Sequence, residues 1–303
     1  MKETKFSITI STKNRINDLI FTLKSLQDLL ERDDIECVVF DDGSTDGTSE
    51  IIKSDFPKVI LLRNEISKGY IYCRNYMLNQ TKAEFAISLD DDAHFLSENP
   101  LEEIENYFNQ NSQCGLIAFR IFWGLQNPSK INSEDQIQQV KAYVGCGHVW
   151  RMSAWKTIPN YPEWFVFYGE EQFASFQLFK NNWQIIYLPS VLVHHRVNIK
   201  DRKKDNDYQT RIRMSLRSGW FLFFLFLPLS EIVKKFTYSL WWQFKSKIFK
   251  GDWKATKGIF QAIIDLIIKV PKILSNRDKL TKSEYLKYNN LQEAKIYWNP
   301  NEE

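Results

Sequence analysis

The chain has 303 residues, and its 44% hydrophobic content is enough to bury a sizeable core in one large domain or two smaller ones. Residues 1–199 hold 19 Lys and Arg against 26 Asp and Glu, whereas residues 200–303 hold 21 against 11, so an acidic body precedes a basic region for which anionic partners are expected. The four cysteines have neither metal-ligand nor redox spacing, which excludes such a site and indicates reduced thiols in a cytoplasmic protein.

Strands and helices alternate through residues 1–95. The first residues lack the apolar stretch of a signal peptide. Strands are predicted at 6–10, 35–40, 59–62 and 85–89, and helices at 16–30, from 45 or 46 to about 53, and at 69–79. This rhythm predicts an α/β protein with a parallel sheet and right-handed crossovers.

The middle section, residues 96–198, is less regular. We expect strands near 115–122, 142–149, 184–187 and 191–194, a helix near 170–181, and a polar loop at 126–138.

From about residue 208 the pattern becomes that of basic amphipathic helices. Apolar residues recur every four positions from 232 to 248, and a second helix is predicted at about 255–274. The apolar run 220–229 is too short to span a membrane, which takes about twenty residues, and Pro228 interrupts it. Trp241 and Trp242 among lysines predict contact of the first helix with an anionic membrane surface. For the second helix, packing on the body or on another copy of the chain is an equal alternative.

Three aspartates, Asp90, Asp91 and Asp92, follow the strand predicted at 85–89. They therefore lie at the carboxyl edge of the sheet, where parallel α/β sheets bind ligands. Adjacent carboxylates repel one another unless a cation or an array of donors is present. Hard divalent cations such as Mg²⁺ or Mn²⁺ take oxygen ligands and accept phosphate as a co-ligand. A solvated acidic loop is the alternative reading of such a run.

Further motifs follow the other predicted strands in order: 11–15 (Ser-Thr-Lys-Asn-Arg), 41–48 (Asp-Asp-Gly-Ser-Thr-Asp-Gly-Thr), 68–69 and 74–75. With the three aspartates, they resemble the family 2 glycosyltransferases of GT-A fold over about residues 5–198. The resemblance implies a Rossmann-like, mostly parallel sheet flanked by helices. Residues 1–95 would form its nucleotide-binding half and 96–198 its acceptor and catalytic half, followed by a C-terminal amphipathic helical region at 199–303.

The donor of such an enzyme is a nucleotide diphosphate sugar. Asp41 or Asp42, at a strand end, can accept a hydrogen bond from a base N–H or a ribose hydroxyl, and in the family the corresponding acid contacts the base. Residues of the first strand end line the other side of that slot, and two basic residues meet the phosphates, although a solvated lysine is an equal alternative for the first of these. The expected donor-binding residues are Ser11, Thr12, Arg15, Asp41, Asp42, Lys68, Arg74, Asp90 and Asp91.

The metal-binding DxD motif of the family maps onto the three aspartates. The resemblance implies that Asp90 faces the ribose and the metal shell and that Asp92 binds Mn²⁺ or Mg²⁺ directly, where the cation neutralises the departing diphosphate. Asp91 should point the opposite way if the backbone stays extended. In many members a histidine at the end of a later strand is the third ligand. His194 matches that position best, and His195 is then expected on the other face.

The segment Gly169-Glu170-Glu171 resembles the Gly-Glu-Asp helix start of the family, which implies Glu171 as the general base. It departs from the family in having Glu for the usual Asp. Gln177 and Asn182 also stand where the family has Arg and Gly. A helix N-terminus lowers the pKa of a carboxyl group, whereas a general base needs burial near the acceptor. An acid pair that only stabilises the helix dipole is the alternative.

The resemblance implies an inverting, metal-dependent glycosyltransferase, with UDP as the expected nucleotide. The basic aromatic tail indicates a glycan or lipid-linked acceptor, polysaccharide biosynthesis, and a location on the inner face of the cell membrane. The alternative is a catalytically impaired nucleotide-sugar-binding protein of the same fold. A haloacid-dehalogenase-type phosphatase is disfavoured because Gly43 stands where its second acid would be. Nucleic acid is not an expected partner, and its binding through the basic tail is kept as a third alternative.

Overall fold

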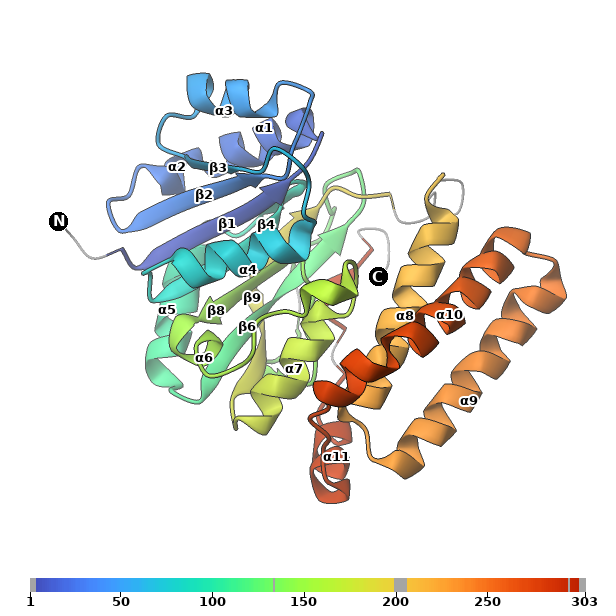
Figure 1. The fold of residues 1–303 in the computed structure, drawn as a ribbon. Helices are drawn as coiled ribbons and strands as arrows, with labels where there is room; N and C mark the ends of the chain where they lie inside the picture. The colour runs from blue at the N-terminus through green and yellow to red at the C-terminus, as the bar shows by residue number, and fades with distance from the viewer. Residues whose placement is uncertain (1–3, 133, 199–205, 294, 300–303) are drawn as a thin grey trace.

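The computed structural model describes residues 4–132, 134–198, 206–293 and 295–299. One mixed sheet runs through the molecule with helices on both faces, and a group of C-terminal helices lies beside α7 (Glu170–Lys180) (Figure 1). The strand order is β3-β2-β1-β4-β8-β6-β9-β5. The α/β class and the helical C-terminal region are therefore confirmed.

The first half contains the predicted alternation of strands and helices. The strands β3, β2, β1 and β4 are parallel to one another, so their carboxyl ends share one edge. The expected helix at 16–30 is divided at Leu26 into two helices. The elements are β1 Phe6–Thr12, α1 Ile16–Ser25, α2 Gln27–Leu30, β2 Ile35–Asp41, α3 Thr48–Asp55, β3 Ile60–Arg63, α4 Tyr70–Gln80 and β4 Phe85–Asp90.

The second half extends the sheet with strands of both directions. Its β8 is antiparallel to β4 and β6, and β9 is parallel to β6. Two strands expected at 184–187 and 191–194 form the single strand β9. Its ladder with β6 continues on both sides of an irregularity around Pro189, which has no N–H to donate. The elements are β5 Ala93–Phe95, α5 Pro100–Gln110, β6 Cys114–Trp123, β7 Gln138–Val140, β8 Gly147–Arg151, α6 Met152–Trp155, a 3-10 turn Glu163–Phe165, α7, and β9 Gln184–His195.

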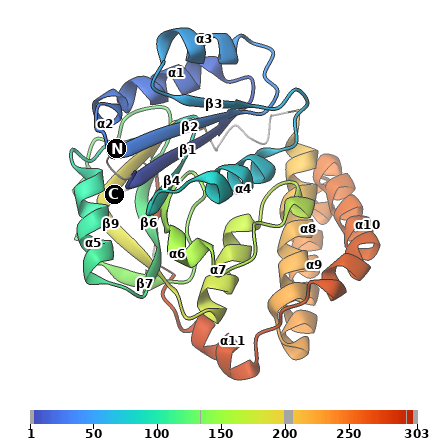
Figure 2. The ribbon, with the colours of Figure 1, turned by 60° about the vertical axis from the view of Figure 1, so that its left-hand side comes forward.

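Two apolar layers hold the sheet. Side chains alternate along each strand, so Phe85, Ile87 and Leu89 of β4 pack under α1, α3 and α5, whereas Ala86 packs under α4, α6 and α7. Figure 2 shows α4, α6 and α7 on one side of the sheet and α5 on the other. The helix α5 was not predicted, although its apolar residues recur at helical spacing. This packing fixes the carboxyl edge of the sheet as a rigid platform.

Among the C-terminal helices, α8 and α11 pack directly on α7. The apolar run near Trp220 belongs to this buried helix, which explains its composition without a membrane. In the part of the chain that the structure describes, no helix has both the length and the apolar character needed to cross a bilayer. The final strand returns to pair with β6. These elements are α8 Tyr208–Phe226, α9 Leu229–Ser246, a 3-10 turn Ile248–Lys250, α10 Trp253–Ser275, α11 Lys282–Asn289 and β10 Tyr297–Trp298.

Candidate functional site

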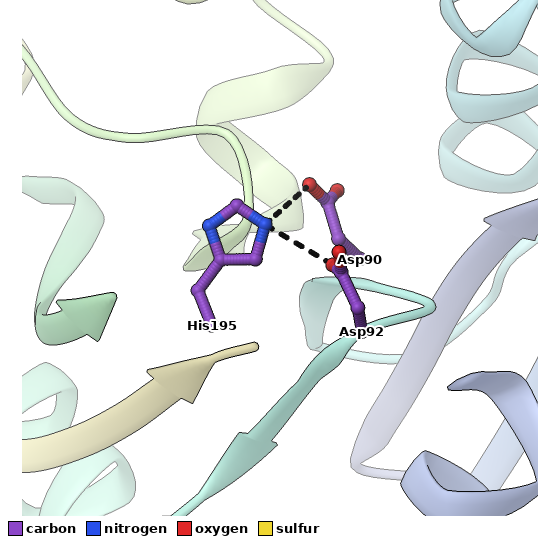
Figure 3. Close-up of side chains that lie close together, drawn as sticks. All are labelled: Asp90, Asp92 and His195. Carbon is purple, nitrogen blue, oxygen red and sulfur yellow. Dashed lines mark ion pairs between the residues drawn. The ribbon is translucent and has the colours of Figure 1, made fainter. Parts of the chain in front are cut away.

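The three aspartates lie where β4 ends and the chain turns into β5. Because β5 pairs with β9 in antiparallel fashion, Ala93 lies opposite His195. This register brings the end of β9 beside the aspartates, 100 residues away in the sequence. Asp90, Asp92 and His195 each place one possible ligand atom within 4.8 Å of the others (Figure 3).

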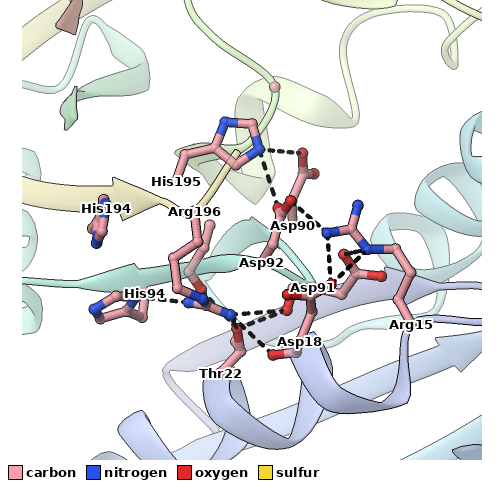
Figure 4. Close-up of polar contacts among 12 residues, drawn as sticks. Arg15, Asp18, Thr22, Asp90, Asp91, Asp92, His94, His194, His195 and Arg196 are labelled. Carbon is pink, nitrogen blue, oxygen red and sulfur yellow. Dashed lines mark hydrogen bonds and ion pairs between the residues drawn. The ribbon is translucent and has the colours of Figure 1, made fainter. Parts of the chain in front are cut away.

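The histidine of this cluster is His195, not His194 as the sequence analysis predicted. Successive side chains of a strand point to opposite faces, so only one of the two can face the acids. The His195 Nε2 atom lies 3.1 Å from Asp92 Oδ1 and 4.0 Å from Asp90 Oδ2. His194 points away, its Nε2 atom 2.8 Å from the carbonyl oxygen of Gly124 (Figure 4).

The donor set of this cluster fits a hard divalent cation. Two carboxylates and one imidazole nitrogen are ligands that Mn²⁺ and Mg²⁺ accept, with positions left for phosphate oxygens. The Nδ1 atom of His195 lies 2.7 Å from the Tyr297 hydroxyl, so the ring is held with Nε2 toward the acids. Such a partner on the second nitrogen is usual for metal-binding histidines.

The Asp92 carboxylate is held in its ionised form by two cations. Burial raises its pKa, but the hydrogen bond and charge of His195 together with Arg15 outweigh burial and hold the pKa at about 2. Arg15 Nη2 donates to Asp92 Oδ2 at 2.7 Å. For His195, burial lowers the pKa, whereas Cys146 and Asp92 raise it to about 11. Asp92, His195 and Arg15 therefore form one charge-paired cluster at the end of β4.

Asp91 faces away from the histidine, as expected. Its Oδ2 atom accepts a 2.7 Å hydrogen bond from the Thr12 hydroxyl, and Arg15 Nε lies 3.2 Å from its Oδ1. Burial raises the pKa of Asp91 to about 7 in spite of Arg15. Thr12 and Arg15 thus hold the acidic turn, and Ser11 lies beside Asp90 across the β1–β4 pairing. A direct contact of these residues with the donor stays a prediction.

Asp41 and Asp42 hold the loops that follow β2 and β3. Asp41 is fully buried and accepts from the Ser44 backbone N–H, from Arg63 and from the Ser49 hydroxyl. Each carboxylate oxygen of Asp42 accepts two hydrogen bonds. The donors to Asp42 are the Asn64 side chain, the Ser67 hydroxyl and the backbone N–H groups of Lys68 and Gly69. The structure therefore gives both acids a part in shaping the predicted base slot.

Lys68 and Arg74, both predicted to meet phosphates, have different surroundings. The Lys68 ammonium group is exposed beside Tyr72, 3.2 Å from its hydroxyl. Arg74 is buried and donates to Asp90 Oδ1 at 2.6 Å and to Glu170 Oε1 at 3.0 Å. Arg74 thus joins the acidic turn to the start of α7, and its donors toward these acids are not directed at a phosphate.

Glu171 lies beside this bridge. Glu170 uses both oxygens, one for Arg74 and one for the Tyr70 hydroxyl at 2.7 Å. Burial raises the pKa of Glu171 well above the usual range, and the charge of Glu170 raises it further. The two adjacent acids therefore divide into an anchored carboxylate, Glu170, and a basic one, Glu171. A raised pKa is the property expected of a general base.

The backbone that leads into α7 is strained. Val166 and Tyr168 have φ of 67° and 65°, a region that costs bulky and β-branched residues free energy, and Gly169 has φ of 89°. Arg217 of α8 donates to the Phe165 carbonyl oxygen, and Ser218 donates to that of Phe167. The C-terminal region therefore helps to hold the segment that presents the two glutamates.

Replacing Gly145 by Ala is expected to lower sugar transfer. An added Cβ would lie 2.5 Å from Glu171 Oε1 and 3.0 Å from Arg74 Nη1, so the carboxylate must move and the guanidinium must shift slightly. A displacement of about 1 Å at a reacting group costs on the order of a hundredfold in rate. Transfer assays and melting curves check this. The matched control is Gly219→Ala, where a Cβ meets nothing within 4 Å. Full activity in Gly145→Ala would show that Glu171 does not act from this position.

Sequence reasoning missed the roles of His195 and Tyr297 and the bridge through Arg74. The pair of histidines was visible, but which of them faces the acids depends on the β5–β9 register. Tyr297 lies 102 residues beyond His195, on β10, and nothing in the local pattern connects the two. Arg74 was recognised as basic, but its two acidic partners come from β4 and α7.

The comparisons with known proteins agree with this geometry. The glycosyl transferase family 2 model matches residues 7–172. The Bacillus subtilis (strain 168) protein "Uncharacterized glycosyltransferase YfnE" is 30% identical over 123 residues, which cover 39% of this chain and 31% of that protein. Residues 1–349 of S. aureus TarS in complex with UDP superpose with a TM-score of 0.53 at 20% identity, over 69% of this chain and 64% of that one. The structure of GalNAc-T7 with UDP, GalNAc and Mn²⁺ superposes with a TM-score of 0.56 at 15% sequence identity, over 72% of this chain and 48% of that one.

The fold is the GT-A fold, and the family match makes the protein a glycosyltransferase. The family model covers more than half of the chain, and the chain belongs to glycosyltransferase family 2. It spans less than a third of the curated relative it matches, and less than two thirds of these two solved structures.

Proposed function

We propose that this protein is an inverting, metal-dependent glycosyltransferase that moves a sugar from a UDP-linked donor to an acceptor hydroxyl. The observation that carries the proposal is the cluster of Asp90, Asp92 and His195 at the carboxyl edge of the sheet, to which Arg74 connects the start of α7. UDP bound to the similar TarS fragment, and UDP with Mn²⁺ bound to GalNAc-T7, support the nucleotide and the cation.

In the proposed reaction the residues of the chain divide into a donor side and an acceptor side. Asp90, Asp92 and His195 would hold Mn²⁺ or Mg²⁺, which when bound stabilises the negative charge of the leaving diphosphate. Glu171 accepts the proton of the acceptor hydroxyl as the oxygen attacks the anomeric carbon opposite the diphosphate. The C–O bond to UDP breaks in the same step, so the anomeric configuration inverts. Glu170 and Arg74 fix the position of the helix that carries the base.

The acceptor and the location belong to the same proposal. We infer a lipid-linked or surface glycan acceptor, presented to the enzyme at the cytoplasmic face of the cell membrane. The basic charge of residues 200–303 and the exposed aromatic residues of α9 and α10 support it.

Replacing Asp92 by Asn tests the donor side. The change should remove the stabilisation that UDP gives in the presence of Mn²⁺, because the side chain loses its charge toward the cation. In the wild-type protein, ligand at about a hundred times its dissociation constant adds about 2.7 kcal/mol to the free energy of unfolding. Thermal unfolding with UDP and MnCl₂, and again with UDP and EDTA, measures this stabilisation.

The matched control is Asp55→Asn at the exposed end of α3, which should respond as the wild type does. UDP binding that is unchanged by Mn²⁺ and by Asp92→Asn would contradict the metal site. Metal-dependent binding without any turnover would favour the alternative, a nucleotide-sugar-binding protein that has lost catalysis.

A further inference from the structure

The turn that joins α9 to α10 gathers exposed aromatic side chains. Trp253 is 82% exposed and Phe249 is 68% exposed. The Phe249 ring lies 6.3 Å, centroid to centroid, from the rings of both Trp241 and Phe244. We name these four residues the aromatic turn. Phe244 is half-buried and the other three are exposed, and exposed aromatic residues gathered in one segment of this kind indicate an interaction site.

Positive charge predominates along α9, the aromatic turn and α10. Residues 229–275 contain nine lysines against three acids, and two of these acids are engaged inside the protein. Asp265 pairs with Arg213 and Arg217 of α8, and Asp252 caps α10 and accepts from the Tyr208 hydroxyl. The lysines are Lys234, Lys235, Lys245, Lys247, Lys250, Lys254, Lys257, Lys269 and Lys272.

The helix α10 continues the apolar surface away from the turn. Its buried residues recur at helical spacing and include Ala255, Ile259 and Ala262, and α10 packs against α8. A second apolar stripe of α10 remains exposed. Its members are Phe260, Ile264, Ile267, Ile268 and Leu274. A helix with one packed apolar face and one exposed apolar face needs a partner for the second.

The aromatic turn is tied to the part of the fold that presents the glutamates. Lys247 Nζ donates to the Tyr208 hydroxyl at the start of α8, at 3.1 Å. One turn further along α8, Arg211 donates to the Tyr168 hydroxyl at 3.2 Å. Tyr168 is separated from Glu170 by a single residue. The segment between α9 and α10 and the start of α7 are therefore connected through side chains of the first turns of α8.

We propose that the aromatic turn and the exposed stripe of α10 form a docking face for a bilayer that contains anionic lipid. Tryptophan and phenylalanine enter the head-group region, lysines meet lipid phosphates, and the apolar stripe of α10 lies along the interface. This docking rests on the proposed function, because it sets the enzyme where a lipid-linked acceptor would reach α7.

Charge favours a bilayer over a second copy of the chain. Two copies that met through this face in a symmetric dimer would bring two sets of lysines together, and like charges repel. An anionic lipid surface instead supplies the opposite charge along the whole face. The exposed aromatic residues do not distinguish the two partners by themselves.

Co-sedimentation with vesicles tests the proposal. The full chain is mixed with vesicles of phosphatidylcholine alone, or with about 30% phosphatidylglycerol, and bound protein is measured as salt is raised. The double variants Phe249→Ala/Trp253→Ala and Lys250→Glu/Lys254→Glu should each weaken binding to the anionic vesicles by about tenfold or more. The matched controls are Leu286→Ala on α11 and Lys24→Glu/Lys53→Glu on α1 and α3, which should bind as the wild type does.

Two outcomes would overturn the docking face. One is that the wild-type protein does not co-sediment with anionic vesicles. The other is binding that the turn variants leave unchanged. A wild-type dimer in sedimentation velocity that becomes a monomer in Phe249→Ala/Trp253→Ala would assign the face to a second copy instead. Thermal stabilisation by UDP and MnCl₂ is measured on every variant. If the wild-type protein shows this stabilisation but does not bind anionic vesicles, the docking is wrong and the proposed donor site stands.

Discussion

Replacing Glu171 by Gln is expected to abolish sugar transfer while donor binding survives. The amide keeps the size of the side chain but cannot take up a proton, and removal of a general base costs about 10² to 10⁴ in rate. Glu171 makes no contact with Asp90, Asp92 or His195, so UDP should still stabilise the variant. The transfer of radiolabelled sugar from a panel of UDP-sugars, beside thermal unfolding with UDP and MnCl₂, measures both quantities.

The matched control for this variant is Glu50→Gln, since Glu50 is an exposed acid in the first turn of α3. It should leave transfer unchanged. Equal loss in both variants would indicate a general charge effect. Transfer that survives in Glu171→Gln would show that Glu171 is not the general base. The adjacent acid Glu170 would then be the next candidate, although its oxygens are already engaged by Arg74 and Tyr70.

The same assignment predicts the direction of the pH dependence. Glu171 can accept a proton only when it is ionised, and burial with the neighbouring charge of Glu170 raises its pKa above the usual 4.5 of a glutamate. Transfer should therefore fall as the pH is lowered through this raised pKa, at a higher pH than an ordinary glutamate would give. In Glu171→Gln the residual rate should lose this acidic limb.

The second large effect is expected for Arg74→Met. Methionine fills the space of the aliphatic stem but leaves Glu170 buried without its cation and Asp90 without its 2.6 Å partner. Breaking a buried ion pair by removing one member costs about 3–5 kcal/mol of unfolding free energy. Denaturant unfolding measures the loss, and transfer should fall as well because α7 loses its tie to the acidic turn.

A second substitution separates the two consequences of the Arg74 change. In Arg74→Met/Glu170→Gln the buried carboxylate is gone as well, so part of the stability should return, as coupling within one ion pair requires. Transfer should stay low, because the bridge to Asp90 is still absent. If the double variant is as unstable as the sum of the single variants, Arg74 and Glu170 are not coupled in the way their contact indicates.

The sequence by itself determined the class of fold and most of the acids of the site. Apolar runs bounded by helix signals fixed the strands of the first half, and the acids after these runs had to fall at the carboxyl edge, because parallel strands share that edge. The same local logic placed Glu171 in the first turn of α7.

Only the tertiary structure decided which side chains meet. Whether His194 or His195 faces the acids depends on the register between β5 and β9, and a shift of one residue exchanges the two faces. Arg74, Asp90 and Glu170 come from α4, β4 and α7, and Tyr297 reaches His195 from β10. Local periodicity carries no information about such contacts, because they arise from the packing of elements distant in sequence.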